Sequence, residues 1–360
     1  MTPLAHRPAS WAVLRAAMHA TDAERAHAVA VAGLSWAGRS APLRAMLQAT
    51  MGPRVGDPVE VMGLRFANRV GLAAGWDKDA RAWPGLATMG FGHVEVGTIT
   101  PRPQPGNPKP RVFRLVEDEA VINRMGFPGA GMAAAAAHLT ASSDPALKPP
   151  GFVLGVNIGR NKATSNEDAA ADACAVLDGL GSFADYVAIN VSSPNTPGLR
   201  ALQRAEELQG LLAAVAAHRD RMVAVVGRSI PLAVKIAPDL DAPGIDGAVD
   251  AAIAAGMAGL IATNTTLARD GLQSGLAGEQ GGLSGKPLAE RSLQVLDAVV
   301  ARAAGRLAIL SVGGVHDADQ ARQRIERGAD LVQVYSGLVY AGPALVRQAA
   351  IGAASGAQRR

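Results

Sequence analysis

Eight short apolar runs, separated by alanine-rich stretches of helical length, constrain the fold more than any other feature of this chain. In chain order the runs are RVGLAAG, HVEVGTIT, FVLGVNIG, YVAINVSS, PLAVKIAP, GLIATNTT, LAILSVGG and LVQVYSGL. Runs of this length between helices are typical of buried parallel strands. Eight of them predict an α/β fold of the (β/α)8 TIM barrel class, since a doubly wound sheet more often has about five or six strands.

Length and composition are consistent with a single barrel that carries additional segments. The chain has 360 residues, of which 49% are hydrophobic and 18% charged, and this balance excludes a disordered or coiled-coil protein. The one cysteine, Cys174, is expected to be a small core hydrophobe in a reducing compartment. No apolar run reaches the roughly 18 to 20 residues of a membrane-spanning helix, and we expect no export signal.

Ahead of the first run, the pattern predicts an N-terminal two-helix extension. The first helix aligns Trp11, Leu14 and Met18 on one face, and the second begins at a capping box from Thr21 to Glu24. Residues 26–38 carry no formal charge but extend only about 20 Å as a helix, less than the ~30 Å of a bilayer core. The second helix therefore lies either in a membrane interface or against the main domain.

We divide the chain into this helical segment, residues 1–45, and the barrel, residues 46–360. A linker of residues 41–58 leads into the barrel, and VEVMGLRF then predicts a hairpin that turns at Met62 and Gly63.

The formal net charge of +4 is confined to the N-terminal part of the chain. The first 54 residues carry six arginines and two acidic residues, and the remainder is neutral. A nucleic-acid enzyme would spread basic residues around its active face, so we expect no nucleic-acid partner. A basic segment made of arginines instead suits an anionic membrane surface.

Polar or glycine residues follow most of the eight runs at their C-terminal ends, and the N-terminal ends carry no such set. They are Lys78, Thr98, Asn157, Asn190, Lys235, Asn264, Gly314 and Ser336. Loops at the C-terminal ends of barrel strands form the active sites of barrel enzymes, so this asymmetry predicts an enzyme. Three connections are long enough to act as lids, namely residues 99–151, 192–203 and 266–286.

These strand ends also indicate the ligand. The glycines near residues 281–285, 313–314 and 337 lie where barrel enzymes bind phosphate, and the alternative is that they only form tight turns. Alternation in PLAVKIAP directs Lys235 into the barrel, where it suits a reduced flavin; a lysine that reaches the rim and a Schiff-base lysine are the alternatives. The asparagines suit a planar heterocycle. The seven histidines show no metal-binding spacing, so we expect no metal.

The ordered motifs from about residue 60 to 345 resemble those of the dihydroorotate dehydrogenase family. They are AAGWDKD, GFGHVEVGTITPRPQPGNPKPR, INRMGF, NIGRNK, AINVSSPNTPGLR, AVKIAPD, IATNTT, GGLSGKPL, SVGGV and VQVYSG. The helical extension resembles the membrane-associated, quinone-reducing class 2, which carries a catalytic serine where the soluble class has cysteine.

The resemblance implies the cofactor FMN and oxidation of (S)-dihydroorotate to orotate in UMP biosynthesis. The implied FMN residues are Ala74, Gly75, Trp76, Asp77, Lys78, Thr98, Asn157, Asn190, Lys235, Thr263, Gly285, Gly314, Tyr335 and Ser336. The implied substrate residues are Lys78, Asn123, Arg124, Met125, Gly126, Phe127, Asn190, Asn195, Asn264 and Thr265. The residues alone do not choose between Ser192 and Ser193 as the base, and the family motif assigns Ser193, with a threonine or water as proton relay.

The same resemblance implies that ubiquinone or menaquinone reoxidises the flavin, through the helical segment, with His27, Arg111 and Tyr335 as polar contacts. It places the protein peripherally on the cytoplasmic face of the inner cell membrane. A soluble dihydroorotate dehydrogenase, a flavin reductase acting on tRNA uracil and a lysine-dependent aldolase are the rival enzymes. A membrane-surface barrel without activity would leave the polar strand ends unexplained.

Overall fold

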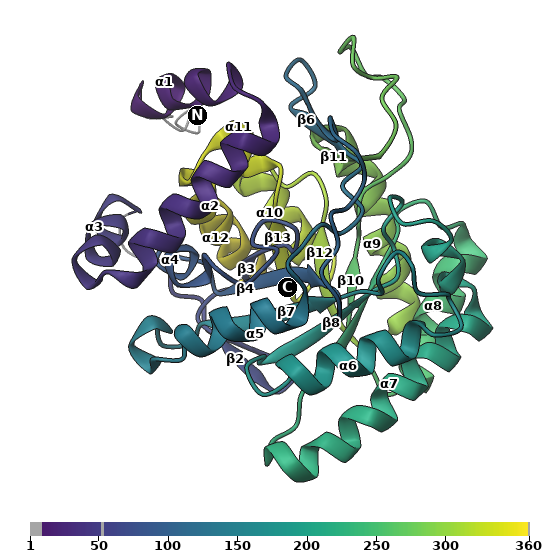
Figure 1. Ribbon diagram of the computed structural model, residues 1–360. Coiled ribbons are helices and arrows are strands. Elements are labelled where there is room, and N and C mark those ends of the chain that lie inside the picture. Colours follow the sequence, from purple (N-terminus) through teal and green to yellow (C-terminus); the bar gives the residue numbers. More distant parts are fainter. Residues whose placement is uncertain (1–8, 52–53, 359–360) are drawn as a thin grey trace.

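Eight parallel strands form a closed barrel in the computed structural model, which describes residues 9–51 and 54–358. The barrel strands are β3 (Val70–Leu72), β4 (His93–Ile99), β7 (Val153–Ile158), β8 (Tyr186–Asn190), β9 (Leu232–Ile236), β10 (Gly259–Ala262), β12 (Ala308–Val312) and β13 (Leu331–Val334). The barrel closes where β13 pairs with β3. Each apolar run contains one of these strands, so the predicted (β/α)8 barrel is confirmed (Figure 1).

Helices surround the barrel and cover the apolar outer face of its strands (Figure 1). They are α4 (Trp83–Ala87), α5 (Gly131–Ala141), α6 (Ala169–Leu180), α7 (Ala205–Val226), α8 (Ala242–Ala254), α9 (Ala289–Ala303), α10 (Ala318–Glu326), α11 (Gly337–Ala341) and α12 (Ala344–Ala357), with 3-10 turns at Pro145–Leu147, Leu199–Gln203 and Lys286–Leu288. Aspartates begin two of the helices, because Asp241 accepts a hydrogen bond from the Gly244 amide and Asp317 from the Gln320 amide. Cys174 lies on α6, partly buried against the core.

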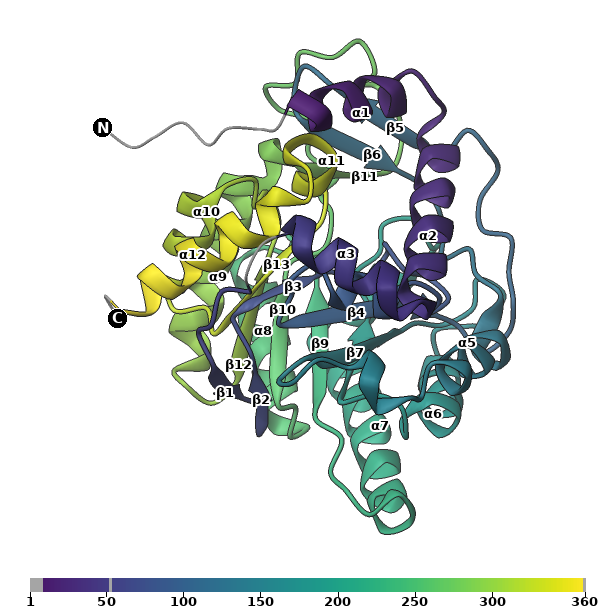
Figure 2. The ribbon, with the colours of Figure 1, turned by 90° about the vertical axis from the view of Figure 1, so that its left-hand side faces the viewer.

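A hairpin closes the N-terminal end of the barrel. Its strands, β1 (Val59–Val61) and β2 (Leu64–Phe66), join at Met62 and Gly63, whose φ angles are +56° and +71°. Positive φ at both positions is what a two-residue hairpin turn of type I′ requires, and the antiparallel pairing of β1 and β2 confirms the predicted hairpin. Val61 and Phe66 pack into the barrel interior. The hairpin lies at the end of the barrel opposite the long connections (Figure 2).

The connections expected to be lids contain regular structure. Residues 99–151 include α5 and a hairpin of β5 (Val112–Leu115) and β6 (Ala120–Asn123), and residues 266–286 include β11 (Gly282–Gly285). β11 pairs antiparallel with β6, so the two connections form one three-stranded sheet above the barrel (Figure 2). The two connections are joined to each other, because their strands share backbone hydrogen bonds and a small core of their own, and their role as lids stays a prediction.

The N-terminal extension has three helices rather than two. They are α1 (Ala9–His19), α2 (Ala23–Arg39) and α3 (Ala41–Met51), so the expected linker begins as a helix and the boundary at residue 45 falls inside α3. The side chain of Leu14 lies outside the described residues. Asp22, not Thr21, caps α2, because its carboxylate accepts from the Arg25 amide at 2.9 Å while the Thr21 hydroxyl donates to the Met18 carbonyl. None of the helices described here is both long and apolar enough to cross a bilayer.

The sequence left open whether the second helix packs against the main domain or lies in a membrane interface. In the structure, α2 has two different faces. Its C-terminal half packs against α4 so closely that a Cβ on Gly38 would lie 2.6 Å from the Gly85 amide nitrogen. Its other face leaves Val29 and Trp36 largely exposed, at 74% and 69%. One face of α2 therefore binds the barrel, and the other presents apolar side chains to the surroundings.

Glycine in the strands makes room for rings inside the barrel. A Cβ on Gly155 of β7 would lie 2.3 Å from the ring of Tyr186, which is completely buried.

We expect Gly155→Ala to lower the free energy of unfolding by about 1–3 kcal/mol through overpacking, measured by urea unfolding. The control is Gly210→Ala on α7, where a Cβ meets nothing within 4 Å; this change should raise stability by about 0.5–1 kcal/mol. Equal stability of the two variants would contradict the packing argument.

Candidate active site

One pocket lies at the C-terminal ends of the barrel strands, and most of the residues expected there line it. Those that do are Ala74, Gly75, Lys78, Thr98, Asn123, Met125, Gly126, Phe127, Asn190, Ser193, Asn195, Lys235, Thr263, Asn264, Thr265, Gly285, Gly314, Tyr335 and Ser336. They come from segments spread between residues 74 and 336, including the sheet above the barrel. The barrel therefore gathers the motifs into one site.

Four of the residues expected to bind FMN or substrate do not line this pocket. The carboxylate of Asp77 is buried and accepts hydrogen bonds from the amides of Arg81 and Ala82, and burial raises its pKa. Asn157 lies behind Thr98, and Trp76 lines a second cavity. The guanidinium of Arg124 is directed outward, where it pairs with Glu279 at 2.6 Å. Asp77 and Asn157 therefore support the pocket wall from behind.

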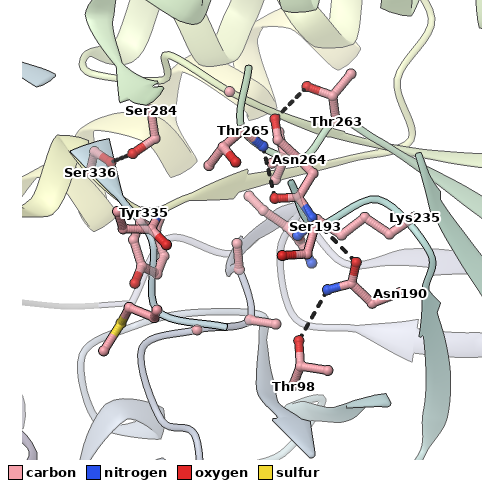
Figure 3. Close-up of a pocket in the computed structure, with 18 of the residues that line it drawn as sticks. Thr98, Asn190, Ser193, Lys235, Thr263, Asn264, Thr265, Ser284, Tyr335 and Ser336 are labelled. Atoms are coloured by element: carbon pink, nitrogen blue, oxygen red, sulfur yellow. Dashed lines mark hydrogen bonds between the residues drawn. The ribbon is translucent and has the colours of Figure 1, made fainter. Parts of the chain in front are cut away.

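Amide and hydroxyl side chains form a continuous network on one side of the pocket (Figure 3). Asn264 donates to Asn190, and Asn190 donates to the Thr98 hydroxyl at 3.0 Å. Thr98 in turn donates to Asn157 at 2.5 Å. The network holds the side chains of Asn190 and Asn264, which line the pocket, in fixed orientations, as recognition of a planar heterocycle requires.

The two serines of the loop after β8 have different surroundings. Ser192 is completely buried, where its hydroxyl donates to Asn190 and accepts from Asn264 at 3.0 Å. Ser193 lines the pocket beside Lys235 and Asn190, and its hydroxyl oxygen accepts from the Asn195 amide (Figure 3). Only Ser193 of the pair can contact a molecule in the pocket.

Lys235 lines the pocket and is 4% exposed, as the alternation of its strand predicted. Burial lowers the pKa of this lysine, and the charge of Glu95 opposes that effect. Glu95 is completely buried and accepts hydrogen bonds from Asn157, from the Tyr186 hydroxyl at 3.0 Å and from Gln333. Reasoning from the sequence missed Glu95, although a carboxylate inside the apolar run HVEVGTIT was a visible signal.

The opposite end of the pocket has small residues and free backbone. Gly285 and Gly314 have φ angles of +106° and +76°, and a Cβ on either would lie 2.4 Å from neighbouring backbone. The hydroxyls of Ser284 and Ser336 lie 2.7 Å apart (Figure 3). Glycine is therefore required at both positions, which leaves the backbone accessible to an anionic group.

A second, mostly apolar cavity lies between the N-terminal helices and the barrel. Residues of α1 and α2 line it, together with Trp76, Leu86, Met89 and Leu338. Four residues line both this cavity and the polar pocket, namely Lys78, Asn123, Met125 and Tyr335. The two spaces therefore meet at the edge of the polar pocket.

The three residues expected to contact quinone are placed differently. His27 lines the apolar cavity, with its ring edge-on to Trp76 at 5.1 Å between centroids. Burial and the charge of Lys78 lower the pKa of His27 to about 3, so its ring is neutral at pH 7. Tyr335 lines the cavity, but Arg111 is not among the described lining residues. Arg111 instead binds Glu24 at 2.7 Å and two backbone carbonyls.

Lys78 lies at the junction of the two spaces. Burial lowers its pKa to about 8, an effect opposed by the charges of Glu24, Asp79 and Asp77. The ammonium is therefore mostly charged at pH 7 and loses its proton as the pH rises above 8. A carboxylate bound here would find a cation held in a largely desolvated position.

Comparison with known proteins identifies the relatives of this chain. The family model described as dihydroorotate dehydrogenase matches residues 58–352. A protein of Anaeromyxobacter sp. named dihydroorotate dehydrogenase (quinone) is 49% identical, over 93% of this chain and 90% of its own length. A protein of the same name from Streptomyces griseus is 50% identical, over 91% of this chain and 88% of its own.

The solved structures agree with the sequence comparison. A crystal structure of dihydroorotate dehydrogenase from Eimeria tenella in complex with ferulenol has a TM-score of 0.79 and 39% sequence identity, and covers 86% of this chain and 88% of the other. The chain therefore belongs to the dihydroorotate dehydrogenase family of oxidoreductases.

Proposed function

We propose that this enzyme oxidises (S)-dihydroorotate to orotate in UMP biosynthesis and passes the electrons through bound FMN to a membrane quinone, ubiquinone or menaquinone. The observation that carries the proposal is the meeting of a polar pocket and an apolar cavity at Lys78, Asn123, Met125 and Tyr335. A polar ring substrate suits the first space and a lipid-soluble acceptor the second. The family is flavin-dependent, and the names of the bacterial relatives specify quinone.

The residues of the polar pocket fit FMN. The backbone at Gly285 and Gly314 and the hydroxyl of Ser336 suit its phosphate, while Lys235, Asn190 and the Thr98 and Thr263 side chains suit the polar edge of its ring. When bound, FMN would accept a hydride and carry electrons onward. Asp77 and Asn157 would act by holding the wall of the pocket, since their side chains point away from it.

The remaining pocket residues fit dihydroorotate. Lys78 would bind its carboxylate, and Asn123, Asn195, Asn264 and Thr265 would bind the N–H and C=O groups of its ring. Asn195 already donates to Asn123 at 3.1 Å, which fixes the direction of both amides. The outward side chain of Arg124 leaves only its backbone for this role.

Ser193 would remove the proton from C5 of dihydroorotate as the hydride leaves C6. A serine hydroxyl must pass its own proton on. Thr196 lies three residues further along the same loop, and its buried hydroxyl is without a hydrogen-bond partner among the described residues. The hydroxyl of Thr265 is also without a partner in the described chain, but Thr196 shares the loop of Ser193, so we assign Thr196 to the expected proton relay.

We expect Ser193→Ala to bind FMN and orotate as the wild type does but to reduce flavin about 10²–10⁴-fold more slowly, because the general base is lost. The measurement is anaerobic stopped-flow reduction at saturating dihydroorotate, from pH 6 to pH 9. The wild-type rate should rise with pH as the relay loses its proton, and the Ser193→Ala rate should be flat.

Ser192→Ala is the matched control for Ser193→Ala. Its hydroxyl lies in the amide network and not in the pocket, so the variant should keep the rise of rate with pH. A wild-type reduction rate in Ser193→Ala would exclude Ser193 as the base.

A substitution in the apolar cavity tests the proposed division of the two half-reactions. Ala30 of α2 lines the cavity, and Ala28 is exposed on the same helix. We expect Ala30→Trp to fill the cavity and lower turnover with ubiquinone or menaquinone at least tenfold, with flavin reduction by dihydroorotate unchanged. Ala28→Trp should leave both half-reactions intact.

Fumarate and NAD serve as alternative acceptors in the same assay. Wild-type turnover with either, or unimpaired quinone turnover in Ala30→Trp, would contradict the proposal.

We further propose that residues 1–45 dock the enzyme peripherally on the cytoplasmic face of the inner cell membrane. The exposed apolar residues Val29 and Trp36 on α2, together with the arginines of this segment, support the proposal, and the exposed Met46 follows directly after it on α3. We expect Trp36→Ser to reduce co-sedimentation with vesicles of anionic lipid. The control is Leu267→Ser, since Leu267 is 53% exposed outside the N-terminal helices. Equal loss in both variants would argue against a specific docking face.

A further inference from the structure

Arg324 is the largest of the completely buried side chains that the structure describes. It lies on α10 and extends to the end of β12, beneath the glycines that line the polar pocket. Its guanidinium donates to the hydroxyls of Ser311, at 2.8 Å, and Ser292, at 2.9 Å, and to the carbonyl of Gly313. Its Nε is buried without a hydrogen-bond partner.

This buried guanidinium has no counter-charge in the part of the chain that the structure describes. All of its hydrogen bonds go to neutral oxygens, and none of the observed ion pairs includes it. Burial, followed by the like charge of Arg327, lowers the pKa of Arg324 to about 9, so the group stays charged at pH 7. Because burying an unpaired charge is costly, its presence calls for an anion that the protein itself does not supply.

The hydrogen bond to Gly313 connects this charge to the pocket. The carbonyl of a trans peptide points away from the N–H of the next residue, so the Gly314 N–H is directed away from Arg324. Gly313 and Gly314 both line the polar pocket, with φ angles of +123° and +76°. In the described chain no oxygen accepts a hydrogen bond from the Gly314 N–H. A cation on the carbonyl side polarises the peptide and strengthens its N–H as a donor.

We propose that Arg324 is the buried counter-charge of the flavin phosphate and acts through the Gly313–Gly314 peptide. It is a positioning residue that selects a phosphorylated flavin over riboflavin. The inference rests on the proposed function, because it requires a phosphate-bearing flavin in this pocket.

A purely structural role would require less than a charged group. The Ser292 hydroxyl lies 2.8 Å from both the Gly313 and the Ala289 carbonyl, and its single proton can serve the Gly313 oxygen without Arg324. A neutral amide could satisfy Ser311 and Ser292 at a lower cost of burial. The positive charge therefore needs an explanation beyond packing, and the adjoining anion site provides it.

The test compares two ligands that differ only in the phosphate. Dissociation constants of FMN and riboflavin are measured by flavin fluorescence on the full-length wild type, Arg324→Met, Arg324→Gln and Arg324→Lys. The ratio of the two constants cancels any general damage to the flavin pocket, so it reports on the phosphate alone.

We expect Arg324→Met and Arg324→Gln to reduce the preference for FMN over riboflavin at least about tenfold, with riboflavin binding nearly unchanged. Arg324→Lys, which keeps the charge, should retain most of the preference. Arg324→Gln keeps N–H donors for the serines and the carbonyl, and so remains a folded neutral variant if Arg324→Met does not fold.

A preference in the folded neutral variants within twofold of the wild-type value would overturn the role of Arg324. Loss of the preference in Arg324→Lys, equal to that in Arg324→Gln, would overturn it as well, because the charge would then not be the cause. Absence of any preference for FMN in the wild type would be a different failure, that of the proposed cofactor.

Discussion

The site depends on charges held out of water at the mouth of the barrel. Lys235 is buried next to an amide network, and Glu95, which opposes the loss of its charge, is buried beneath that network. Neither group could remain there alone, because an isolated ion in the protein interior is strongly unfavourable. Strands β4 and β9 lie on different parts of the barrel, so only the closed barrel brings the two charges together. The same closure orients the asparagines toward the pocket.

The second requirement is that the polar pocket be separate from the apolar cavity. The pocket above the barrel offers amides, hydroxyls and lysines, whereas the cavity beneath α1 and α2 is lined mainly by apolar side chains. Lys78 and Tyr335 are exposed to both spaces, so a flat cofactor in the pocket would have one edge at the apolar cavity. Burial raises the pKa of Tyr335 to about 12, which keeps its hydroxyl neutral at this junction.

Much of the site was visible in the sequence, for local reasons. Asn190, Lys235 and Asn264 each lie in an apolar run, and strand alternation with the known orientation of barrel strands predicts where they meet. Other predictions from sequence were wrong or incomplete. The capping box at Thr21 gave way to Asp22, the linker at residue 41 became a helix, and the expected lids pair through β6 and β11.

The sequence by itself determined the barrel, the polar ends of its strands and the conformation of its short turns. These properties depend on residues a few positions apart, which hydrophobic periodicity and glycine placement record directly. Only the tertiary structure decided which serine faces the pocket, that Arg111 binds Glu24 and that Arg324 lacks a counter-charge. Those outcomes depend on burial and on groups distant in the chain, and the free energy of a charge is set by the surroundings that the complete fold provides.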